Sequence, residues 1–200
     1  MYTLISGSPK MSQSNSMYFI NILKEKINNY ELFELKKHSY NNVINSMNNS
    51  DSIVLAFPLY VDSPPSLTLQ FLDYIIDNQI NLKDKLIYVI INCGFREGTQ
   101  NTTAVNIIKR WCEKTNAKFG CSIQIGAGEI VGKKKYKFIS TNALKKLNEF
   151  INIVKNYQIK PDVITTVDIL NNKLYCLLAN ISWTNHGKKY KLSKSDLMTK

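Results

Sequence analysis

The feature that most constrains this fold is the regular alternation of short apolar runs with stretches of helical periodicity. Five apolar runs have the length of strands, and those at 52–57 (SIVLAF) and 85–93 (KLIYVIINC) are almost continuously apolar. The segments between them have apolar residues on one helical face, as 15–28 does. Continuous apolar strands that alternate with helices indicate a parallel sheet covered by helices on both faces.

This alternation predicts an α/β protein with a doubly wound, five-stranded parallel sheet in the flavodoxin-like order 2-1-3-4-5. After residue 157 the rhythm breaks. The predicted domains are therefore residues 1–157 and a C-terminal extension, 158–200, which packs on the core or on a partner subunit. The predicted strands are 2–6, 31–36, 52–57, 85–93 and 118–126, and the predicted helices are 15–28, a weak one around 43–47, one that opens at Pro65, 101–116 and 140–157.

Composition narrows the class of protein further. The chain has 200 residues, 44% of them hydrophobic, which is enough for one sizeable core. No apolar run is long enough to span a bilayer, and the first residues do not read as a secretion signal. The four cysteines are widely spaced, so we interpret them as reduced thiols and expect a cytoplasmic protein. Two isolated histidines do not suggest a metal site.

The net charge of +11 raises the possibility of a polyanionic partner. The lysines are scattered, however, apart from two clusters at 132–137 and 186–194. Abundant Lys, Asn and Ile together suggest a coding bias rather than a binding surface. We therefore expect solvated basic faces and no nucleic-acid partner.

In a doubly wound sheet the ligand lies beyond the carboxyl ends of the strands, near the point where the strand order reverses. That position selects the segments that follow the first, third and fourth predicted strands. They are 6–16 (SGSPKMSQSNS), 58–65 (PLYVDSPP) and 92–101 (NCGFREGTQN). We expect these three segments to lie side by side.

The first of these segments has the chemistry of an anion site. A helix N-terminus offers unpaired N–H groups and the positive end of a dipole, and serine and asparagine side chains add donors. Gly7 allows a sharp turn and Pro9 stiffens it. The alternative is that Ser14 or Asn15 merely caps the helix. Because a cap needs one such residue and this segment has six, we favour a phosphate site.

Absent motifs argue against several ligand and enzyme classes. The glycine fingerprint of dinucleotide-binding folds and the Gly-Lys-Ser/Thr ending of a nucleoside triphosphatase loop are both missing. The Gly-x-Ser-x-Gly elbow of serine hydrolases is missing as well.

Residues 1–155 contain a set of motifs that, in their order along the chain, resembles the flavodoxin-like NAD(P)H-dependent FMN reductase family of oxidoreductases. The resemblance rests on ISGSPKMSQSNS near the start, on SDSIVLAFPLYVDSPPSLTLQFLD at 50–73, on NCGFREGTQN, and on IGAGE at 125–129. The chain departs from the family pattern at two positions: Pro65 replaces a residue that is commonly glycine in that family, and Gln70 replaces one that is commonly lysine. The cysteine cluster of iron–sulfur relatives is absent, so we exclude such a cluster.

The resemblance implies non-covalently bound FMN, NADH or NADPH as co-substrate, a small-molecule electron acceptor and a homodimer. The flavin would carry the chemistry, without a catalytic side chain or a metal. Arg96 and Lys10 are either ligand contacts or surface residues. The implied cofactor-binding residues are Ser6, Ser8, Pro9, Ser14, Asn15 and Ser16 at the phosphate end, and Pro58, Leu59, Tyr60, Val61, Asn92, Cys93, Gly94 and Phe95 around the ring.

Three functions remain open from the sequence. The first is an FMN-dependent NAD(P)H oxidoreductase that reduces a quinone, flavin, nitro or azo compound. The second is a flavodoxin-type electron carrier, although such carriers are usually acidic. The third is a non-catalytic nucleotide-binding protein on the same fold, since a fold alone does not determine function.

Overall fold

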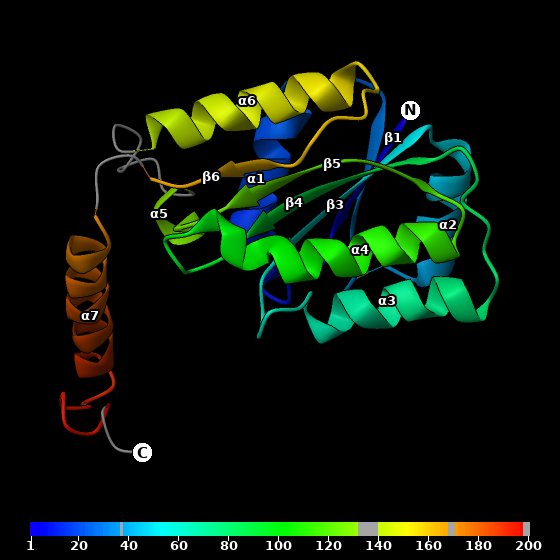
Figure 1. The fold of residues 1–200 in the computed structure, drawn as a ribbon. Coiled ribbons are helices and arrows are strands. Elements are labelled where there is room, and N and C mark those ends of the chain that lie inside the picture. Colours follow the sequence, from blue (N-terminus) through cyan, green and yellow to red (C-terminus); the bar gives the residue numbers. More distant parts are fainter. Residues whose placement is uncertain (37, 132–139, 168–170, 198–200) are drawn as a thin grey trace. The chain divides into compact units, whose positions relative to one another are not determined.

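The computed structural model describes residues 1–36, 38–131, 140–167 and 171–197, and the chain forms two compact units, Met1–Asp168 and Ile169–Lys200 (Figure 1). The first unit alternates strands and helices as expected. Its strands are β1 (Tyr2–Ser6), β2 (Tyr30–Glu34), β3 (Ser52–Pro58), β4 (Leu86–Asn92), β5 (Lys118–Ile125) and β6 (Val163–Thr165). Its helices are α1 (Asn15–Lys24), α2 (Tyr40–Asn49), α3 (Ser66–Asp77), α4 (Thr102–Lys114), α5 (Gly128–Val131) and α6 (Thr141–Lys155), with 3-10 turns η1 (Met11–Gln13) and η2 (Gly98–Asn101).

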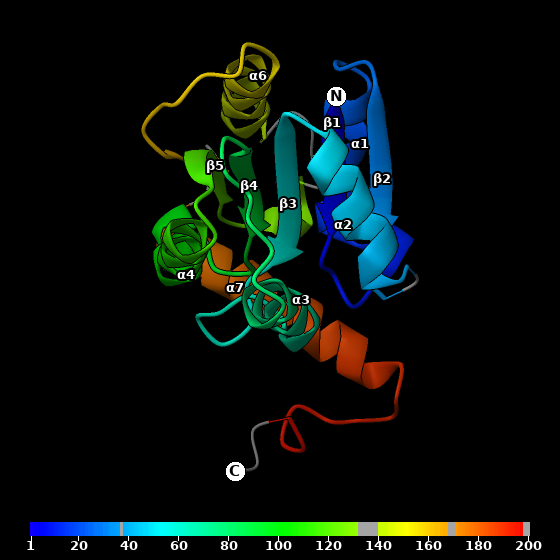
Figure 2. The same ribbon diagram turned by 90° about the vertical axis from the view of Figure 1, so that its right-hand side faces the viewer.

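All six strands are parallel and lie in the order β2-β1-β3-β4-β5-β6. Helices α1 and α6 cover one face of the sheet, and α2, α3 and α4 cover the other (Figures 1 and 2). The predicted doubly wound class and the order of the first five strands are therefore confirmed. The predicted strand count is wrong by one, because a sixth strand forms within the segment that we assigned to the extension.

The central strands β3 and β4 fill both layers of the core because they are apolar at every position apart from their polar end residues, Ser52 and Asn92. On the α2–α4 face, Ile53, Leu55 and Phe57 of β3 lie beside the alternate residues of β4, and none is more than 1% exposed. On the other face Tyr88 meets Phe150 of α6 edge to face, at a ring-centroid distance of 6.3 Å. Burial of both faces explains why these strands read as continuous apolar runs.

The sixth strand arrives by an uncommon connection. From β3 through β5 to β6 the chain steps along the sheet in one direction, yet α6 lies on the face opposite to α3 and α4. The β5–α6–β6 connection therefore has the opposite hand to the others, and such crossovers are rare. Asp162 anchors the strand: it pairs with Lys109 of α4 and accepts hydrogen bonds from the Ser122 N–H (3.0 Å) and hydroxyl (2.7 Å).

The second unit consists mainly of one helix, α7 (Asn172–Lys188). Asn171 caps it, since its side-chain oxygen accepts the Leu174 N–H at 2.9 Å. One stripe of the helix is apolar and 42–56% exposed, and it contains Leu174, Leu177, Leu178 and Ile181. Among the described residues, no helix combines the length and hydropathy needed to cross a bilayer. The basic cluster at 186–194 begins at the end of α7, and the one at 132–137 lies outside the described residues.

Candidate functional site

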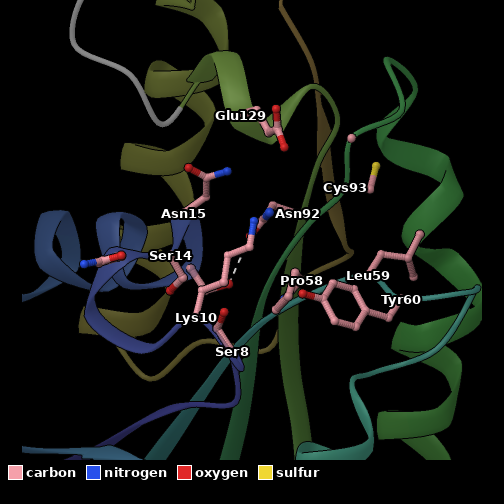
Figure 3. A pocket seen from close by; sticks show the side chains of 13 residues that line it. Ser8, Lys10, Ser14, Asn15, Pro58, Leu59, Tyr60, Asn92, Cys93 and Glu129 are labelled. Atoms are coloured by element: carbon pink, nitrogen blue, oxygen red, sulfur yellow. Dashed lines mark hydrogen bonds between the residues drawn. The ribbon is translucent and has the colours of Figure 1, made fainter. Parts of the chain in front are cut away.

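The three segments selected from the sequence meet at the carboxyl ends of β1, β3 and β4 and enclose one cavity of about 310 Å³ (Figure 3). Their side-by-side placement confirms the expectation drawn from strand order. Of the fourteen predicted cofactor-binding residues, ten line this cavity. They are Ser8, Ser14, Asn15, Ser16, Pro58, Leu59, Tyr60, Asn92, Cys93 and Gly94.

Asn92, the last residue of β4, joins the three segments. Its carbonyl accepts the Leu59 N–H at 2.8 Å, which ties the β4 end to the turn after β3. Its side-chain oxygen accepts the Ser16 hydroxyl at 3.1 Å, which ties it to the start of α1. Asn92 is 5% exposed, so these bonds are shielded from water. Through them the cavity wall is fixed by backbone and buried polar groups.

The first segment turns closely against α3. A Cβ atom on Gly7 would lie 2.1 Å from the Thr68 hydroxyl oxygen, and that hydroxyl donates to the Gly7 carbonyl at 3.2 Å. Glycine is therefore required at this position by the approach of α3. The tight turn directs the following residues, Ser8 to Ser16, around one end of the cavity.

Ser14 has both of the roles that the sequence left open. It is the N-cap of α1, because its hydroxyl oxygen accepts the Met17 N–H at 3.1 Å, and it also lines the cavity. A hydroxyl that accepts one bond still has its own proton to donate. Together with Ser8 and the first N–H groups of α1, Ser14 makes this end of the cavity rich in donors for an anion.

The segment after β3 is a tight turn with unusual backbone geometry. Tyr60 and Ser63 exchange two backbone hydrogen bonds, of 2.9 and 3.1 Å, around Val61 and Asp62. Both central residues have positive φ, 48° at Val61 and 58° at Asp62, as in a type I′ turn. A β-branched residue is unfavourable there. The turn places Tyr60 beside the cavity and leaves Val61 fully in solvent.

The segment after β4 contributes Cys93 to the cavity wall. Cys93 is 4% exposed, and its thiol accepts a hydrogen bond from the Asn101 amide at 3.5 Å. Burial raises the pKa of Cys93, so the thiol stays protonated at neutral pH. It is therefore a packing group rather than a nucleophile, as the sequence favoured.

Four predicted residues do not line the cavity. Ser6 points into the protein, where its hydroxyl is buried without a hydrogen-bond partner among the described residues. Pro9 is half-buried in the turn, and Val61 and Phe95 are 99% and 57% exposed. Side-chain direction at a strand end and in a turn depends on backbone angles that the motif does not specify.

Two lining residues were missed, and a third was left undecided. Gln13 is in the predicted segment but was not selected, and Lys10 was left between ligand contact and surface. Glu129, in the first turn of α5, directs its carboxylate toward the cavity (Figure 3). Its position directly after β5, at the same edge of the sheet as the three selected segments, is the sequence signal that could have identified it. Lys10 and Glu129 are thus the charged residues of a lining that is otherwise uncharged.

No known protein-family model matches the chain, and no curated protein matches its sequence. Solved structures do match. They include an NADPH-quinone reductase from P. pentosaceus, with 16% identity and a TM-score of 0.61 over 78% of this chain and 96% of that one. An FMN-dependent NADH-azoreductase from Bacillus anthracis matches with 13% identity and a TM-score of 0.58, over 78% and 99%. A Streptococcus pneumonia TIGR4 flavodoxin has 13% identity and a TM-score of 0.57, over 78% and 99%. The chain therefore has the flavodoxin-like fold, as its motifs predicted.

Proposed function

We propose that this protein binds FMN and is an NAD(P)H-dependent oxidoreductase that passes electrons to a small acceptor. The observation that carries the proposal is the single cavity formed by three strand ends, with hydroxyl and N–H donors at one end and backbone turns at the other (Figure 3). Structures of similar fold include reductases described as NADPH-quinone reductase and FMN-dependent NADH-azoreductase. The motifs and the cavity together support this assignment.

The residues present fit FMN. A phosphate suits the end lined by Ser8, Ser14 and Asn15, because neutral donors and a helix N-terminus hold a dianion without an arginine. A planar ring suits the other end, where the cavity wall consists of Pro58–Tyr60 and Asn92–Gly94. Gly94 has open space around it, so backbone there can approach a ligand closely.

When bound, FMN would supply the hydride and electron transfer, which the twenty side chains cannot perform alone. The chain would bind and orient it. Ser8 and Ser14 would donate to its phosphate oxygens, and the Leu59–Asn92 hydrogen bond keeps the two ring-side turns at a fixed separation. Because the flavin needs no acid–base partner from the protein for this chemistry, we assign no catalytic side chain.

The first test is the visible spectrum of the purified protein, recorded before and after addition of NADH or NADPH without oxygen. We expect a flavin spectrum that either nicotinamide bleaches, and steady NAD(P)H consumption once a quinone or azo compound is added. A flavin that resists bleaching would favour a flavodoxin-type carrier. Protein that binds no FMN on soaking would refute the proposal and leave a non-catalytic binding protein.

A second test uses two serines of the first segment. Ser8 is 3% exposed and lines the cavity, whereas Ser12 is exposed and does not. Ser8→Ala should weaken FMN binding about tenfold, because a hydrogen bond to a charged group is lost. Binding of riboflavin, which has no phosphate, should be nearly unchanged. Ser12→Ala is the control, and an equal loss for both ligands or both variants would contradict a phosphate site.

We further propose a homodimer in which α7 contacts a partner subunit. Its apolar stripe, defined by Leu174, Leu177, Leu178 and Ile181, is the surface that supports this proposal. A helix face of this spacing is typical of one that packs on another surface. The cytoplasmic location stays a prediction from cysteine usage.

A further inference from the structure

The sixth strand packs against the back of the segment that follows β4. The hydroxyl of Thr166, the first residue after β6, donates to the Arg96 carbonyl. The carbonyl of Thr165 accepts the Gly126 N–H at 2.9 Å. The two threonines thus contact both the segment after β4 and the end of β5.

The backbone is closely packed around two glycines, Gly98 and Gly126. A Cβ on Gly98 would lie 2.6 Å from the carbonyl oxygens of Gln124 and Thr165, and one on Gly126 would lie 2.0 Å from the Arg96 carbonyl oxygen. Backbone atoms are the obstacles in each case, so no side-chain rotation relieves them. The turn at 93–98 is therefore held between β5 and β6.

The same turn forms the cavity wall on its other side. The Gly128 N–H donates to the Cys93 carbonyl at 2.9 Å, and the Ala127 N–H donates to the Phe95 carbonyl at 2.6 Å. Cys93 and Gly94 line the cavity, whereas Arg96 and Thr166 do not. Arg96 is thus two residues along the chain from Gly94, which lies in the wall beside the proposed ring site.

We propose that Thr166 is a positioning residue of the cofactor site: its hydroxyl holds the Arg96 carbonyl and so fixes the turn at 93–96 beside the flavin ring. This inference rests on the proposed function for its ligand. It gives the rare β5–α6–β6 connection a role, since that connection delivers Thr165 and Thr166 to the carboxyl edge of the sheet. Thr166 contacts no ligand itself.

The test compares FMN and riboflavin binding to full-length Thr166→Val and Thr166→Ser by flavin fluorescence quenching. Thr166→Val keeps the side-chain shape and removes the donor, so both flavins should bind about tenfold more weakly, by the same factor. Thr166→Ser keeps the hydroxyl and should restore binding to within about twofold. Thr184→Val is the matched control, because its hydroxyl also donates to a backbone carbonyl, that of Asn180 at 2.8 Å, on α7.

A second readout does not need a flavin. In the ligand-free protein, Thr166→Val should accelerate amide hydrogen exchange at Ala127 and Gly128, whose N–H groups bond to the held turn. If Thr166→Val does not fold, Thr166→Ala takes its place in both measurements. Wild-type protein that binds neither flavin would refute the proposed function. Unchanged exchange in Thr166→Val would refute the proposal that Thr166 fixes the turn at 93–96.

A third outcome separates positioning from mere stability. If wild-type protein binds flavin and the folded Thr166→Val variant binds both flavins as tightly, the inference is wrong even if the variant melts earlier. A selective loss of FMN with riboflavin unaffected would also overturn it. That pattern would place the effect of Thr166 at the phosphate end rather than beside the ring.

Discussion

Helices α6 and α7 have similar lengths and each has a stripe of large apolar residues, but the stripe of α6 is buried inside the first unit whereas that of α7 is exposed. In α6, Leu147, Phe150 and Val154 are at most 1% exposed because they face the sheet. In α7, Leu177 and Ile181 are 56% and 49% exposed. The comparison shows that an apolar stripe becomes a core only where a complementary surface covers it.

The sheet provides that surface for α6 through two tyrosines. The Tyr88 hydroxyl donates to the Gln158 carbonyl at 3.0 Å just beyond the helix, and its ring contacts Phe150. The Tyr2 ring stacks on Tyr157 at a centroid distance of 5.4 Å. Polar ends and apolar rings together fix α6 on β1 and β4.

The largest expected difference between the two helices is in stability. Phe150→Ala removes a fully buried ring and leaves a cavity, so the free energy of unfolding should fall by about 3–5 kcal/mol. Leu177→Ala on α7 should change the unfolding of the first unit by less than about 0.5 kcal/mol. Urea titrations followed by tryptophan fluorescence measure both, and equal losses would show that α7 is part of the same core.

A smaller effect on the stability of the first unit is expected at alkaline pH, through the two tyrosines that contact α6 and the residues just after it. Burial raises the pKa of Tyr88 to about 12 and also raises that of Tyr2, so the folded state favours the neutral phenols. Their contribution to stability is complete below the unfolded pKa of about 10 and is lost as pH rises through the folded value. We therefore expect the free energy of unfolding of the first unit to decline between about pH 10 and pH 12.

Tyr88→Phe isolates the part of this effect that Tyr88 contributes, since it removes that phenol and keeps the ring beside Phe150. Chemical denaturation of both proteins across this pH range should give a shallower decline for the variant. Parallel curves would mean that other groups, such as Tyr2 or lysines, cause the alkaline loss.

The smallest expected effect on folding comes from charging the stripe of α7. Leu177→Glu combined with Ile181→Glu should leave the thermal midpoint of the first unit unchanged. If α7 contacts a partner subunit, the same change should convert dimer to monomer in light scattering. Asn180→Glu, on an exposed and polar part of α7, is the control and should stay dimeric. A wild-type monomer would refute the proposed dimer directly.

Most of the fold could be predicted from the sequence because local signals agreed with it. The strands at 52–58 and 86–92 are apolar at every inner position, and Pro65 sets the start of α3 as expected. The sixth strand could not be predicted, since it has three residues, follows Pro161, and arrives by a connection of the rarer hand.

The sequence predicted where the cavity lies, and the role of the fourteen selected residues in cofactor binding stays a prediction. Strand order placed three segments together, and ten of fourteen selected residues line the cavity. The four selected residues that do not line it are Ser6, Pro9, Val61 and Phe95, whose placement depends on backbone angles at a strand end and in turns. Glu129 was missed because it comes from a fourth segment, after β5, which reaches the cavity by packing of Gly128 against Asn92 and by a backbone hydrogen bond to Cys93.

The sequence by itself determined the parallel sheet, its covering helices and the donor-rich turn after β1, because periodicity and turn chemistry act between near neighbours in the chain. Only the tertiary structure decided which side chains face the cavity, that β6 packs against the turn at 93–98, and which residues of the sheet cover the apolar stripe of α6. These features depend on contacts between segments far apart in the chain, such as Thr166 with Arg96. A local pattern does not contain that information, since the partner of each group is set by where the whole chain packs.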